Sequence, residues 1–203
     1  MIIVAATNNR HKLEEIGAIT ASFDMELLSR KEAGADGFEI EEDGTTFEEN
    51  SLKKAKTIME VSGKPSLADD SGLAVDFLDG APGVYSARFA GEDGNDAKNN
   101  AKLLDLMKDV PEEQRGAAFV SVITLVFPDG ETLVARGECR GRILYELQGE
   151  NGFGYDPLFV PEGFDKSFGE LSAEEKNRIS HRARALAELE RQLKERLGKE
   201  TDR

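Results

Sequence analysis

Apolar residues recur at two different spacings along this chain, which predicts both strands and helices. Residues 2–6 form an apolar, partly β-branched run that predicts a buried strand. Between residues 13 and 23 the apolar side chains recur at the spacing of one helix face. Residues 25–28 predict a second short strand, and a glycine- and acid-rich loop follows through residue 44.

A second helix is predicted to begin at two threonines, Thr45 and Thr46, each followed by a glutamate at the spacing of a capping box. The sequence Gly-Lys-Pro at residues 63–65 is expected to end this helix. Its expected buried side chains are Phe47, Leu52, Ala55, Ile58 and Met59. One of its lysines, Lys53, Lys54 or Lys56, is a candidate to approach the acids described next, although the alternative places all of them in solvent.

Two adjacent acids, Asp69 and Asp70, stand between apolar runs. Residues 67–68 predict a short buried strand, and Ser71 and Gly72 predict a turn directly after the acids. At a strand end both carboxylates can face one site, where a hard cation or a shared proton relieves their repulsion. The alternative is a solvated turn, but a surface turn does not usually stand between two buried runs.

The second half of the chain continues the mixture of helices and strands. The predicted elements are a strand at 73–78, a helix at 95–108, long strands at 117–127 and 131–140, a short strand at 158–160, and a final helix from the capping box at Ser172 and Glu175 to residue 197. The sequence Pro-Asp-Gly between the long strands predicts an antiparallel hairpin. Helix 95–108 is expected to turn inward Ala97, Ala101, Leu104 and Met107.

This order of elements predicts an α/β fold with a mixed β-sheet and flanking helices. Because no repeat or low-complexity tract interrupts the chain, residues 1–203 are predicted to form a single domain with two lobes around a central cleft. The polar tail at 198–203 is expected to be frayed.

The net charge of −14 and the hydrophobic content of 39% are typical of a globular protein without a nucleic-acid-binding face. A small phosphorylated metabolite remains compatible, because a few buried cations outweigh screened distant charges. The chain has no long apolar run and no basic leader, so we expect a cytoplasmic protein with no membrane partner. The single cysteine, Cys139, is expected to pack within a strand.

A polar turn joins the first predicted strand to the first helix. Backbone N–H groups at a helix start, beside a hydroxyl, an amide and a lysine, form an anion site. The turn lacks the glycine-rich pattern of a P-loop, and ordinary capping by Thr7 or Asn9 explains it equally well. The candidate residues are Thr7, Asn8, Asn9, Arg10, His11 and Lys12.

Two later groups of residues are candidates for ligand binding. Loop 149–157 combines glycines with Phe153 and Tyr155, which we interpret as stacking surfaces for a flat ligand. Near the start of the last helix there is a polar cluster, although a histidine alone is more often structural than catalytic. The cluster consists of Lys176, Ser180, His181 and Arg182.

Six motifs, taken in order, resemble the inosine triphosphate pyrophosphatase family over nearly the whole chain. They are Thr7-x-Asn9-x-x-Lys12, Glu42-x-Gly44-x-Thr46-Phe47-x-Glu49-Asn50-x-x-x-Lys54-Ala55, Ala68-Asp69-Asp70-Ser71-Gly72-Leu73, Gly80-x-Pro82-Gly83-x-Tyr85-Ser86-Ala87-Arg88, Gly152-Phe153-Gly154-Tyr155-Asp156-Pro157, and Glu175-Lys176-x-x-x-Ser180-His181-Arg182. The chain departs from the family at Asn8, where glycine is common, and at Glu150 and Asn151, where a small pair is common.

The resemblance implies an elongated mixed sheet in two lobes, a homodimer, and Mg²⁺-dependent hydrolysis of ITP, dITP and XTP to the nucleoside monophosphate and pyrophosphate. It implies that Glu42 and Asp70 bind the metal, that Asp70 also accepts the proton of water, and that Asp69 and Ser71 support that site. It assigns the triphosphate to Thr7, Asn9, Lys12 and Lys54, with Asn8, Arg10 and His11 of the same turn as further substrate-binding candidates. It assigns the base to Phe153, Gly154, Tyr155, Asp156, Lys176, His181 and Arg182. A donor such as Arg182, His181 or a backbone N–H can pair with the 6-oxo group of the base.

Two other functions fit the residues without the resemblance. The strand, turn and acid pair also suit a metal-dependent phosphomonoesterase that removes one terminal phosphate. A catalytically silent nucleotide-binding module, in which the acid pair is only a turn, is the third hypothesis.

Overall fold

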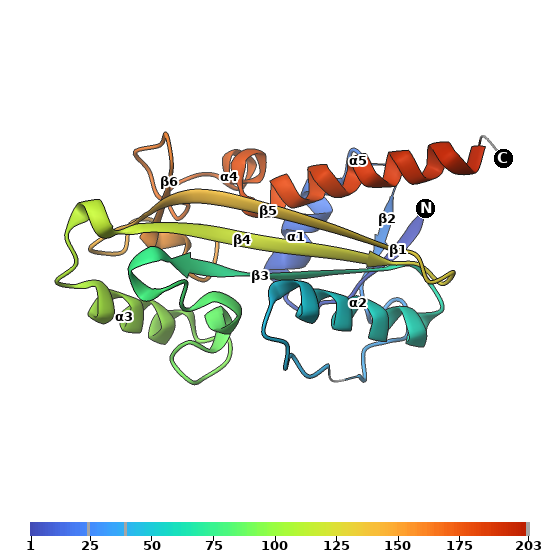
Figure 1. The fold of residues 1–203 in the computed structure, drawn as a ribbon, viewed down its shortest axis with the longest axis horizontal. Helices are drawn as coiled ribbons and strands as arrows, with labels where there is room; N and C mark the ends of the chain where they lie inside the picture. The colour runs from blue at the N-terminus through green and yellow to red at the C-terminus, as the bar shows by residue number, and fades with distance from the viewer. Residues whose placement is uncertain (24, 39, 202–203) are drawn as a thin grey trace. The chain divides into compact units, whose positions relative to one another are not determined.

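The computed structural model describes residues 1–23, 25–38 and 40–201, and the chain folds into helices and strands that alternate in sequence as far as β4 (Figure 1). The helices are α1 Arg10–Thr20, α2 Phe47–Ser62, α3 Asp96–Met107, α4 Ala173–Ile179 and α5 His181–Thr201. The strands are β1 Ile2–Ala5, β2 Glu26–Leu28, β3 Ser66–Val75, β4 Gly116–Val126, β5 Thr132–Ile143 and β6 Phe159–Pro161.

The strands form one six-stranded sheet in the order β2-β1-β3-β4-β5-β6. Strand β1 pairs in parallel with β2 and β3, whereas β5 pairs antiparallel with β6. The predicted α/β fold with a mixed sheet is therefore confirmed. The predicted turn between β4 and β5 is also present, closed by a bond from the Phe127 N–H to the Glu131 carbonyl of 2.9 Å.

The chain divides into two compact units. The first unit contains Met1–Asp70, Ser121–Gly137 and Arg182–Arg203, and the second contains Ser71–Val120 and Glu138–His181. Each unit has its own buried core. The predicted arrangement as one domain with two lobes around a cleft, and the elongation of the sheet, stay predictions.

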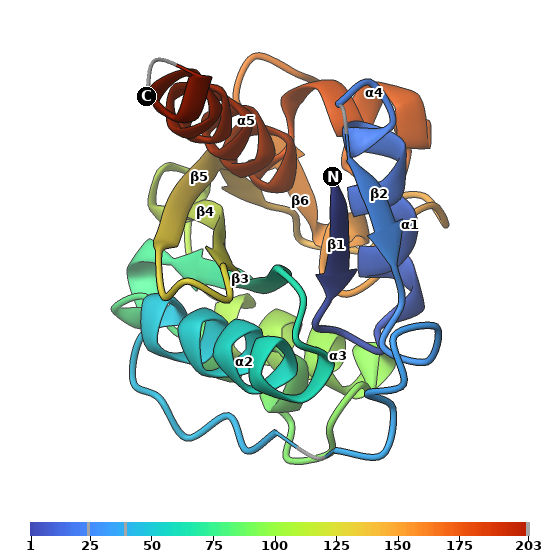
Figure 2. The same ribbon diagram turned by 90° about the vertical axis from the view of Figure 1, so that its right-hand side faces the viewer.

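The first unit packs helices on both faces of its strands. Ile3 of β1 packs with Ile16 of α1 and with α5, whereas its neighbour Val4 packs with Ile58 of α2. Successive strand residues point to opposite faces, so α2 lies on one side of β1 and α5 on the other (Figure 2).

The second unit is organised around aromatic rings. Phe119 of β4 makes an edge contact with Phe159 of β6, with ring centroids 4.8 Å apart. Leu103 of α3 and Phe168 are buried in the same cluster. Cys139 of β5 belongs to it and is buried, which confirms its predicted role in packing.

The turn predicted at Ser71 and Gly72 is wrong, because β3 continues unbroken from Ser66 to Val75. Leu73 and Val75 are fully buried in the core of the second unit. Their burial holds the chain extended, so packing overrides the local turn propensity of Ser-Gly. Asp69 and Asp70 therefore lie inside a strand, and the solvated-turn alternative is also wrong. The strand predicted at 73–78 ends at Val75, and a short 3₁₀ turn follows.

Helix details differ from the sequence prediction in places. Only Thr46 forms a capping box with Glu49; the N–H and hydroxyl of Thr45 also donate to Glu49, so the predicted box of Thr45 with Glu48 is wrong. Leu52 is 42% exposed, because it lies on the solvent side of α2.

The inward face of α3 was also predicted incorrectly. Ala97 and Ala101 are exposed, whereas Asn99, Asn100 and Leu103 are buried. The buried asparagines bond to loop backbone, which offsets the cost of burying their amides.

The single long helix predicted from Ser172 is in fact two helices. Its capping box with Glu175 is present, but Ser180 adopts an extended conformation (φ −67°, ψ 161°) and separates α4 from α5. Residues 198–201 continue α5 where a frayed tail was expected, and residues 202–203 lie outside the described part.

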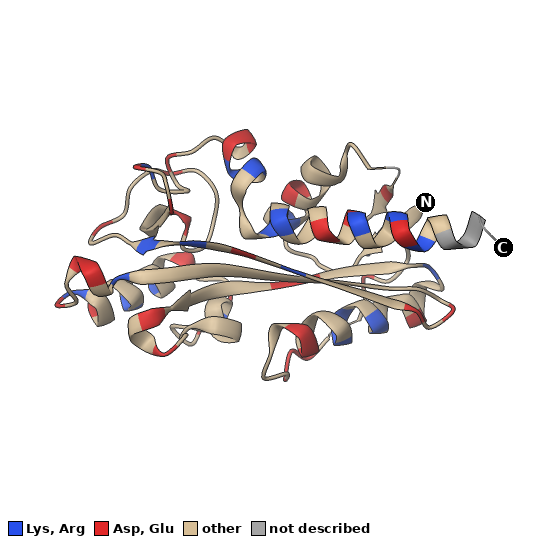
Figure 3. Cartoon of the chain, turned by 45° about the horizontal axis from the view of Figure 1, so that its top comes forward, with Lys and Arg blue, Asp and Glu red and all other residues tan. Residues whose placement is uncertain are grey.

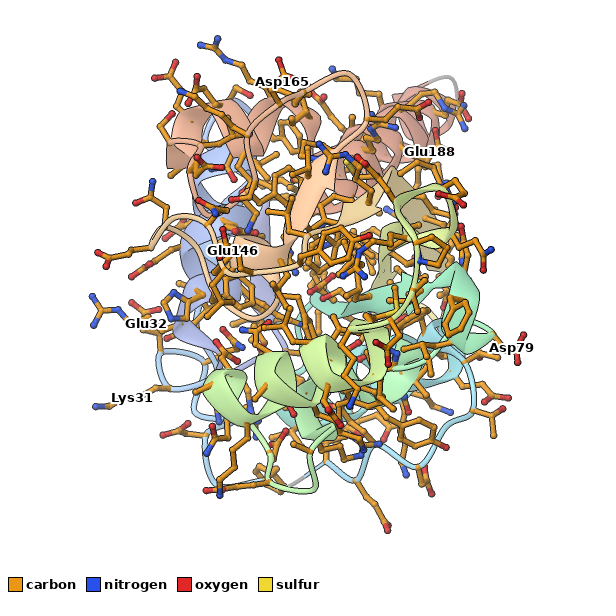
Figure 4. The ribbon with its side chains drawn as sticks, turned by 90° about the vertical axis from the view of Figure 1, so that its left-hand side faces the viewer. Lys31, Glu32, Asp79, Glu146, Asp165 and Glu188 are labelled. Atoms are coloured by element: carbon orange, nitrogen blue, oxygen red, sulfur yellow. The ribbon has the colours of Figure 1, made fainter. Side chains whose placement is uncertain are left out.

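Most charged side chains lie at the surface. Acids and bases are interspersed along α5 (Figure 3), where Arg191 pairs with Glu188 at 2.6 Å. Exposed acids such as Asp79, Glu146 and Asp165 are labelled in Figure 4. No helix in the described residues is both long and apolar enough to cross a bilayer.

Candidate functional site

Strand β3 extends past the end of β1, which leaves part of its backbone to bond with side chains. The Ala6 N–H donates to the Leu67 carbonyl at 2.7 Å, and the chain then leaves the sheet for α1. Farther along β3, the carbonyl of Asp69 accepts from Lys12 Nζ at 3.3 Å and from Lys54 Nζ at 3.1 Å. Two lysines from different helices thus meet where the neighbouring strand ends.

The carboxylate of Asp69 is fully buried and surrounded by donors. It accepts from the Ser121 hydroxyl at 2.6 Å, and its other oxygen lies 2.9 Å from both Lys12 Nζ and an Arg182 Nη. Burial alone would raise the pKa of Asp69, but the charges of Arg182 and Lys12 hold it well below the usual range. Asp69 therefore stays ionised and anchors the cations around it.

Arg182 is bound to two carboxylates and is 1% exposed. One of its terminal nitrogens donates to Asp69 and the other to Glu15 of α1. Sequence reasoning missed Glu15 and Ser121. Ser121 is one of two hydroxyl residues, with Thr124, in the mostly apolar strand β4, which was the available signal for it. No signal distinguished Glu15 from other helix-surface acids.

Asp70 faces a different partner, in keeping with the alternation of side chains along a strand. Its Oδ1 accepts from Lys54 Nζ at 2.8 Å, and the same ammonium lies 3.3 Å from Glu42 Oε2. Its Oδ2 is buried and has no hydrogen-bond partner among the described residues. Lys54 is therefore the lysine of α2 that approaches the acids, as one hypothesis from the sequence had it.

The two acids beside Lys54 titrate differently. Burial raises the pKa of Asp70 and the nearby Glu42 charge adds to this, while Lys54 and Lys12 oppose it. Burial acts on Glu42 in the same direction, but the Lys54 charge, a hydrogen bond with Asp70 and the Lys12 charge together outweigh it and lower the pKa of Glu42. Asp70 is thus the better proton acceptor of the pair.

The loop that carries Glu42 is tied to α2. Asn50 Oδ1 accepts from the Gly44 N–H at 2.8 Å, and a Cβ at Gly44 would lie 2.5 Å from that oxygen. Lys54 lies one helical turn beyond Asn50, so the bond between Gly44 and Asn50 brings Glu42 close to Lys54. We call Glu42, Lys12, Lys54, Asp69, Asp70 and Arg182 the acid–lysine cluster.

The donors of this cluster fit a hard divalent cation. No group of three or more His, Cys, Asp or Glu side chains suited to a metal occurs within residues 1–23, 25–38 and 40–201. The carboxylates of Glu42 and Asp70 nevertheless both lie beside the Lys54 ammonium, so two carboxylates are close together. The Oδ2 of Asp70 has no hydrogen-bond partner among the described residues and can bind a cation. Mg²⁺ takes one or two protein carboxylates and completes its shell with phosphate and water oxygens.

The polar turn before α1 is capped as the simpler hypothesis predicted. Asn9 Oδ1 accepts from the Lys12 N–H at 3.1 Å, and Thr7 Oγ1 accepts from the Asn9 N–H at 3.1 Å. Asn8, Arg10 and His11 are exposed, and Arg10 pairs with Glu14 at 2.8 Å. Within the turn, Lys12 is the residue with bonds to the acids.

The glycine–aromatic loop, residues 149–157, belongs to the second unit. Asp156 Oδ2 accepts from the Phe153 N–H at 3.0 Å and from Lys176 Nζ at 2.6 Å. Both charged groups are buried, and Lys176 Nζ lies 4.9 Å from the centre of the Phe153 ring. Gly152 has φ +74°, and a Cβ there would lie 2.0 Å from Asp156 Oδ2. An ion pair and a glycine thus set the place of Phe153.

Tyr155 and His181 pack in the core of the second unit. Tyr155 is 4% exposed and donates its hydroxyl to the Ser86 carbonyl at 2.7 Å, so its interpretation as a stacking surface is wrong. Burial raises the pKa of Tyr155, and Asp96 adds to the effect. The His181 ring stacks on Phe119 with centroids 4.8 Å apart.

The predicted site residues therefore form two groups. The first unit brings together Glu42, Lys12, Lys54, Asp69, Asp70 and Arg182. The second unit contains Ser71, Phe153, Gly154, Tyr155, Asp156, Lys176 and His181, of which the loop residues and Lys176 are joined by direct bonds.

Comparisons with known proteins concern the chain as a whole. The Ham1 family model matches residues 3–192. A dITP/XTP pyrophosphatase of Clostridium perfringens is 51% identical over 197 residues, covering 94% of this chain and 96% of that protein. Another dITP/XTP pyrophosphatase, from Geobacter sulfurreducens, is 51% identical over 191 residues, with 94% and 96% covered.

A solved structure is similar in fold as well. The Staphylococcus aureus Ham1 protein is 41% identical, with a TM-score of 0.85 over 97% of this chain and all of that one. Family model, sequence and fold agree over nearly the full length, which confirms the resemblance seen in the motifs. The chain therefore belongs to the Ham1 family.

Proposed function

We propose that this protein is a nucleoside triphosphate pyrophosphatase that hydrolyses noncanonical purine nucleotides, dITP, ITP and XTP, to the monophosphate and pyrophosphate. The observation that carries the proposal is Lys54 held between Glu42 and the buried Asp70. It occurs in a chain that is 51% identical over nearly its full length to a dITP/XTP pyrophosphatase.

In this proposal the acid–lysine cluster holds the phosphates. Lys12 and Lys54 supply positive charge, and Thr7 and Asn9 supply polar groups at the start of α1. Glu42 and Asp70 hold Mg²⁺, which when bound neutralises phosphate charge and polarises phosphorus. Without that neutralisation, the carboxylates of the cluster would repel a polyphosphate.

Asp70 is the proposed proton acceptor. Water adds its oxygen to phosphorus, the anhydride bond between the α- and β-phosphates breaks, and the water proton goes to Asp70 and then to solvent. Burial raises the pKa of Asp70, which makes it a stronger base than an exposed aspartate. Asp69 takes no proton in this scheme, because its pKa is held well below the usual range, and Ser71 supports the site from β3.

The base is the proposed ligand of the second unit. Phe153 provides a ring face, with Gly154, Tyr155 and Asp156 of the same loop and with Lys176 and His181 as candidate donors to the 6-oxo group. Adenine, with an amino group there, would leave such a donor unpaired, at a cost of roughly 1–3 kcal/mol. Arg182 was predicted as the alternative donor, but both terminal nitrogens bind carboxylates, which supports a role in holding Asp69.

We further propose a homodimer in the cytoplasm, with no nucleic-acid or membrane partner, as the family resemblance implies. Sedimentation of the purified protein at micromolar concentration tests the dimer. A single species with the mass of one chain would exclude it.

Product analysis with dITP and Mg²⁺ tests the function. We expect pyrophosphate and dIMP from the wild type. Orthophosphate and dIDP would indicate the phosphomonoesterase instead, and no turnover would indicate a silent nucleotide-binding module. Asp105→Asn, an exposed acid on α3, is the matched control for Asp70→Asn, and only the latter is expected to abolish the reaction.

A further inference from the structure

The glycine–aromatic loop needs external contacts to hold one conformation. Gly149, Gly152 and Gly154 all have positive φ, between 60° and 83°. Such residues are the most flexible in the unfolded chain, so ordering them costs more entropy than ordering any other residue. Asp156 fixes the loop on one side of Phe153 through the bonds described above.

Helix α3 fixes the loop on the other side of Phe153. The Gly154 N–H donates to Asp96 Oδ2 at 2.7 Å, and the Gly154 carbonyl accepts from Asn100 Nδ2 at 2.9 Å. Asp96 and Asn100 are one helical turn apart, so both side chains reach the same point. Both backbone polar groups of Gly154 are therefore bound by one helix.

The two side chains differ in surroundings. Asp96 is exposed, at the first residue of α3, whereas Asn100 is 6% exposed. The Asn100 Oδ1 is buried without a hydrogen-bond partner among the described residues, a cost that the protein tolerates while Nδ2 holds Gly154. We call Asp96, Asn100 and Gly154 the clamp. Of these three residues, only Gly154 belongs to the motifs found in the sequence.

We propose that Asp96 and Asn100 are positioning residues for base recognition, which fix Gly154 so that the ring of Phe153 is ready to stack on the purine. The inference rests on the proposed function, because it takes Phe153 as a contact of the base. Neither residue touches substrate in this proposal. Supporting residues of this kind typically change affinity or activity by about 10–100-fold when removed.

The test compares Asp96→Ala and Asn100→Ala with Asp96→Asn, whose amide oxygen still accepts from Gly154, and with Asp105→Ala on the exposed face of the same helix. We expect the two clamp variants to raise KM for dITP about tenfold with a smaller change in kcat. KM for dITP should stay within about twofold of wild type in Asp96→Asn, because its amide oxygen keeps the bond to Gly154. It should also stay within about twofold in Asp105→Ala, because Asp105 does not bond to Gly154.

Inorganic tripolyphosphate, which has no base, separates positioning from general damage. Its inhibition constant against dITP should be unchanged in the clamp variants. The dissociation constant of dIMP, measured by calorimetry, should rise by about the same factor as KM for dITP. An unchanged KM in Asp96→Ala, or an equal loss for tripolyphosphate, would overturn the proposal. If Asn100→Ala does not fold, Asp96→Ala decides, because its side chain is exposed.

The two proposals fail in different ways. The proposed function fails if the wild type leaves dITP intact. The clamp fails if the wild type binds dIMP and Asp96→Ala binds it equally well, whether or not turnover occurs.

Discussion

The two groups of site residues are stabilised in different ways. In the acid–lysine cluster, mostly buried opposite charges from a strand, three helices and a loop compensate one another, with Asp69 at the centre. In the second unit, the glycine–aromatic loop depends on one buried ion pair and on hydrogen bonds to its backbone. The acid–lysine cluster lies mainly on helices and a strand, which suits a proposed role in a reaction that is the same for every substrate. The glycine–aromatic loop is held by neighbouring side chains, which suits a proposed role in selecting the base.

Asp70→Asn is expected to have the largest effect of the proposed variants. Loss of the proposed proton acceptor should lower kcat by about 10²–10⁴-fold, equally for dITP and XTP, because in the proposed function the base is bound by the second unit. Steady-state kinetics on both nucleotides, with Asp105→Asn as control, measures this. A variant that kept half of its activity would remove Asp70 from the chemistry.

Asp69→Asn should mainly reduce stability. It leaves buried Arg182 and Lys12 without their central carboxylate, at a cost of about 3–5 kcal/mol in the free energy of unfolding. Because the folded pKa of Asp69 is depressed, this stabilisation is present at neutral pH and is lost as pH falls below the unfolded pKa of about 3.9.

Urea unfolding in EDTA at pH 7 and at acid pH measures this dependence. The difference between wild type and Asp69→Asn should shrink as the solution becomes more acidic. A difference that stayed constant down to pH values well under about 3.9 would show that ionisation of Asp69 is not its source.

Lys176→Met and Arg182→Ala test the division between the two groups. We expect Lys176→Met to lower kcat/KM for dITP by roughly 10–100-fold and for dATP by less, because both bases lose the ion pair that holds Phe153 but only the 6-oxo base also loses a buried donor. Arg182→Ala should affect both nucleotides alike, because its contacts are Asp69 and Glu15. If Arg182→Ala lowered kcat/KM for dITP but not for dATP, Arg182 would be a base-recognition residue.

Lys54→Met should strengthen binding of a divalent cation when no nucleotide is present. The Lys54 ammonium lies between Glu42 and Asp70, and the same carboxylates raise its pKa against the effect of burial, so it stays charged. Removing this competing charge should tighten Mn²⁺ binding on the order of tenfold, which corresponds to about 1.4 kcal/mol.

Mn²⁺ titration followed by electron paramagnetic resonance checks the Lys54 prediction, and Lys56→Met, exposed on the same helix, is its control. KM for the metal–nucleotide complex should rise in Lys54→Met, because the phosphates lose a cation. Weaker Mn²⁺ binding in Lys54→Met would show that the lysine supports the metal site and does not compete for it.

The sequence by itself predicted the early alternation of strands and helices, the late hairpin, and the motifs that resemble the family. Periodicity and capping are local properties, so β1, α1, α2 and the turn between β4 and β5 follow from nearby residues. Asp69 and Asp70 were also predicted from the sequence, because a buried charge between apolar runs needs a partner, whereas Glu42 followed only from the family resemblance.

Tertiary structure alone decided how those residues are used. Ser71 and Gly72 have the composition of a turn, yet burial of Leu73 and Val75 keeps β3 extended. Ser180 breaks a helix that its sequence would continue, and Glu15 and Asn100 gain their roles from partners more than 50 positions away. Such contacts depend on which chain segments pack together, and that is a property of the whole fold.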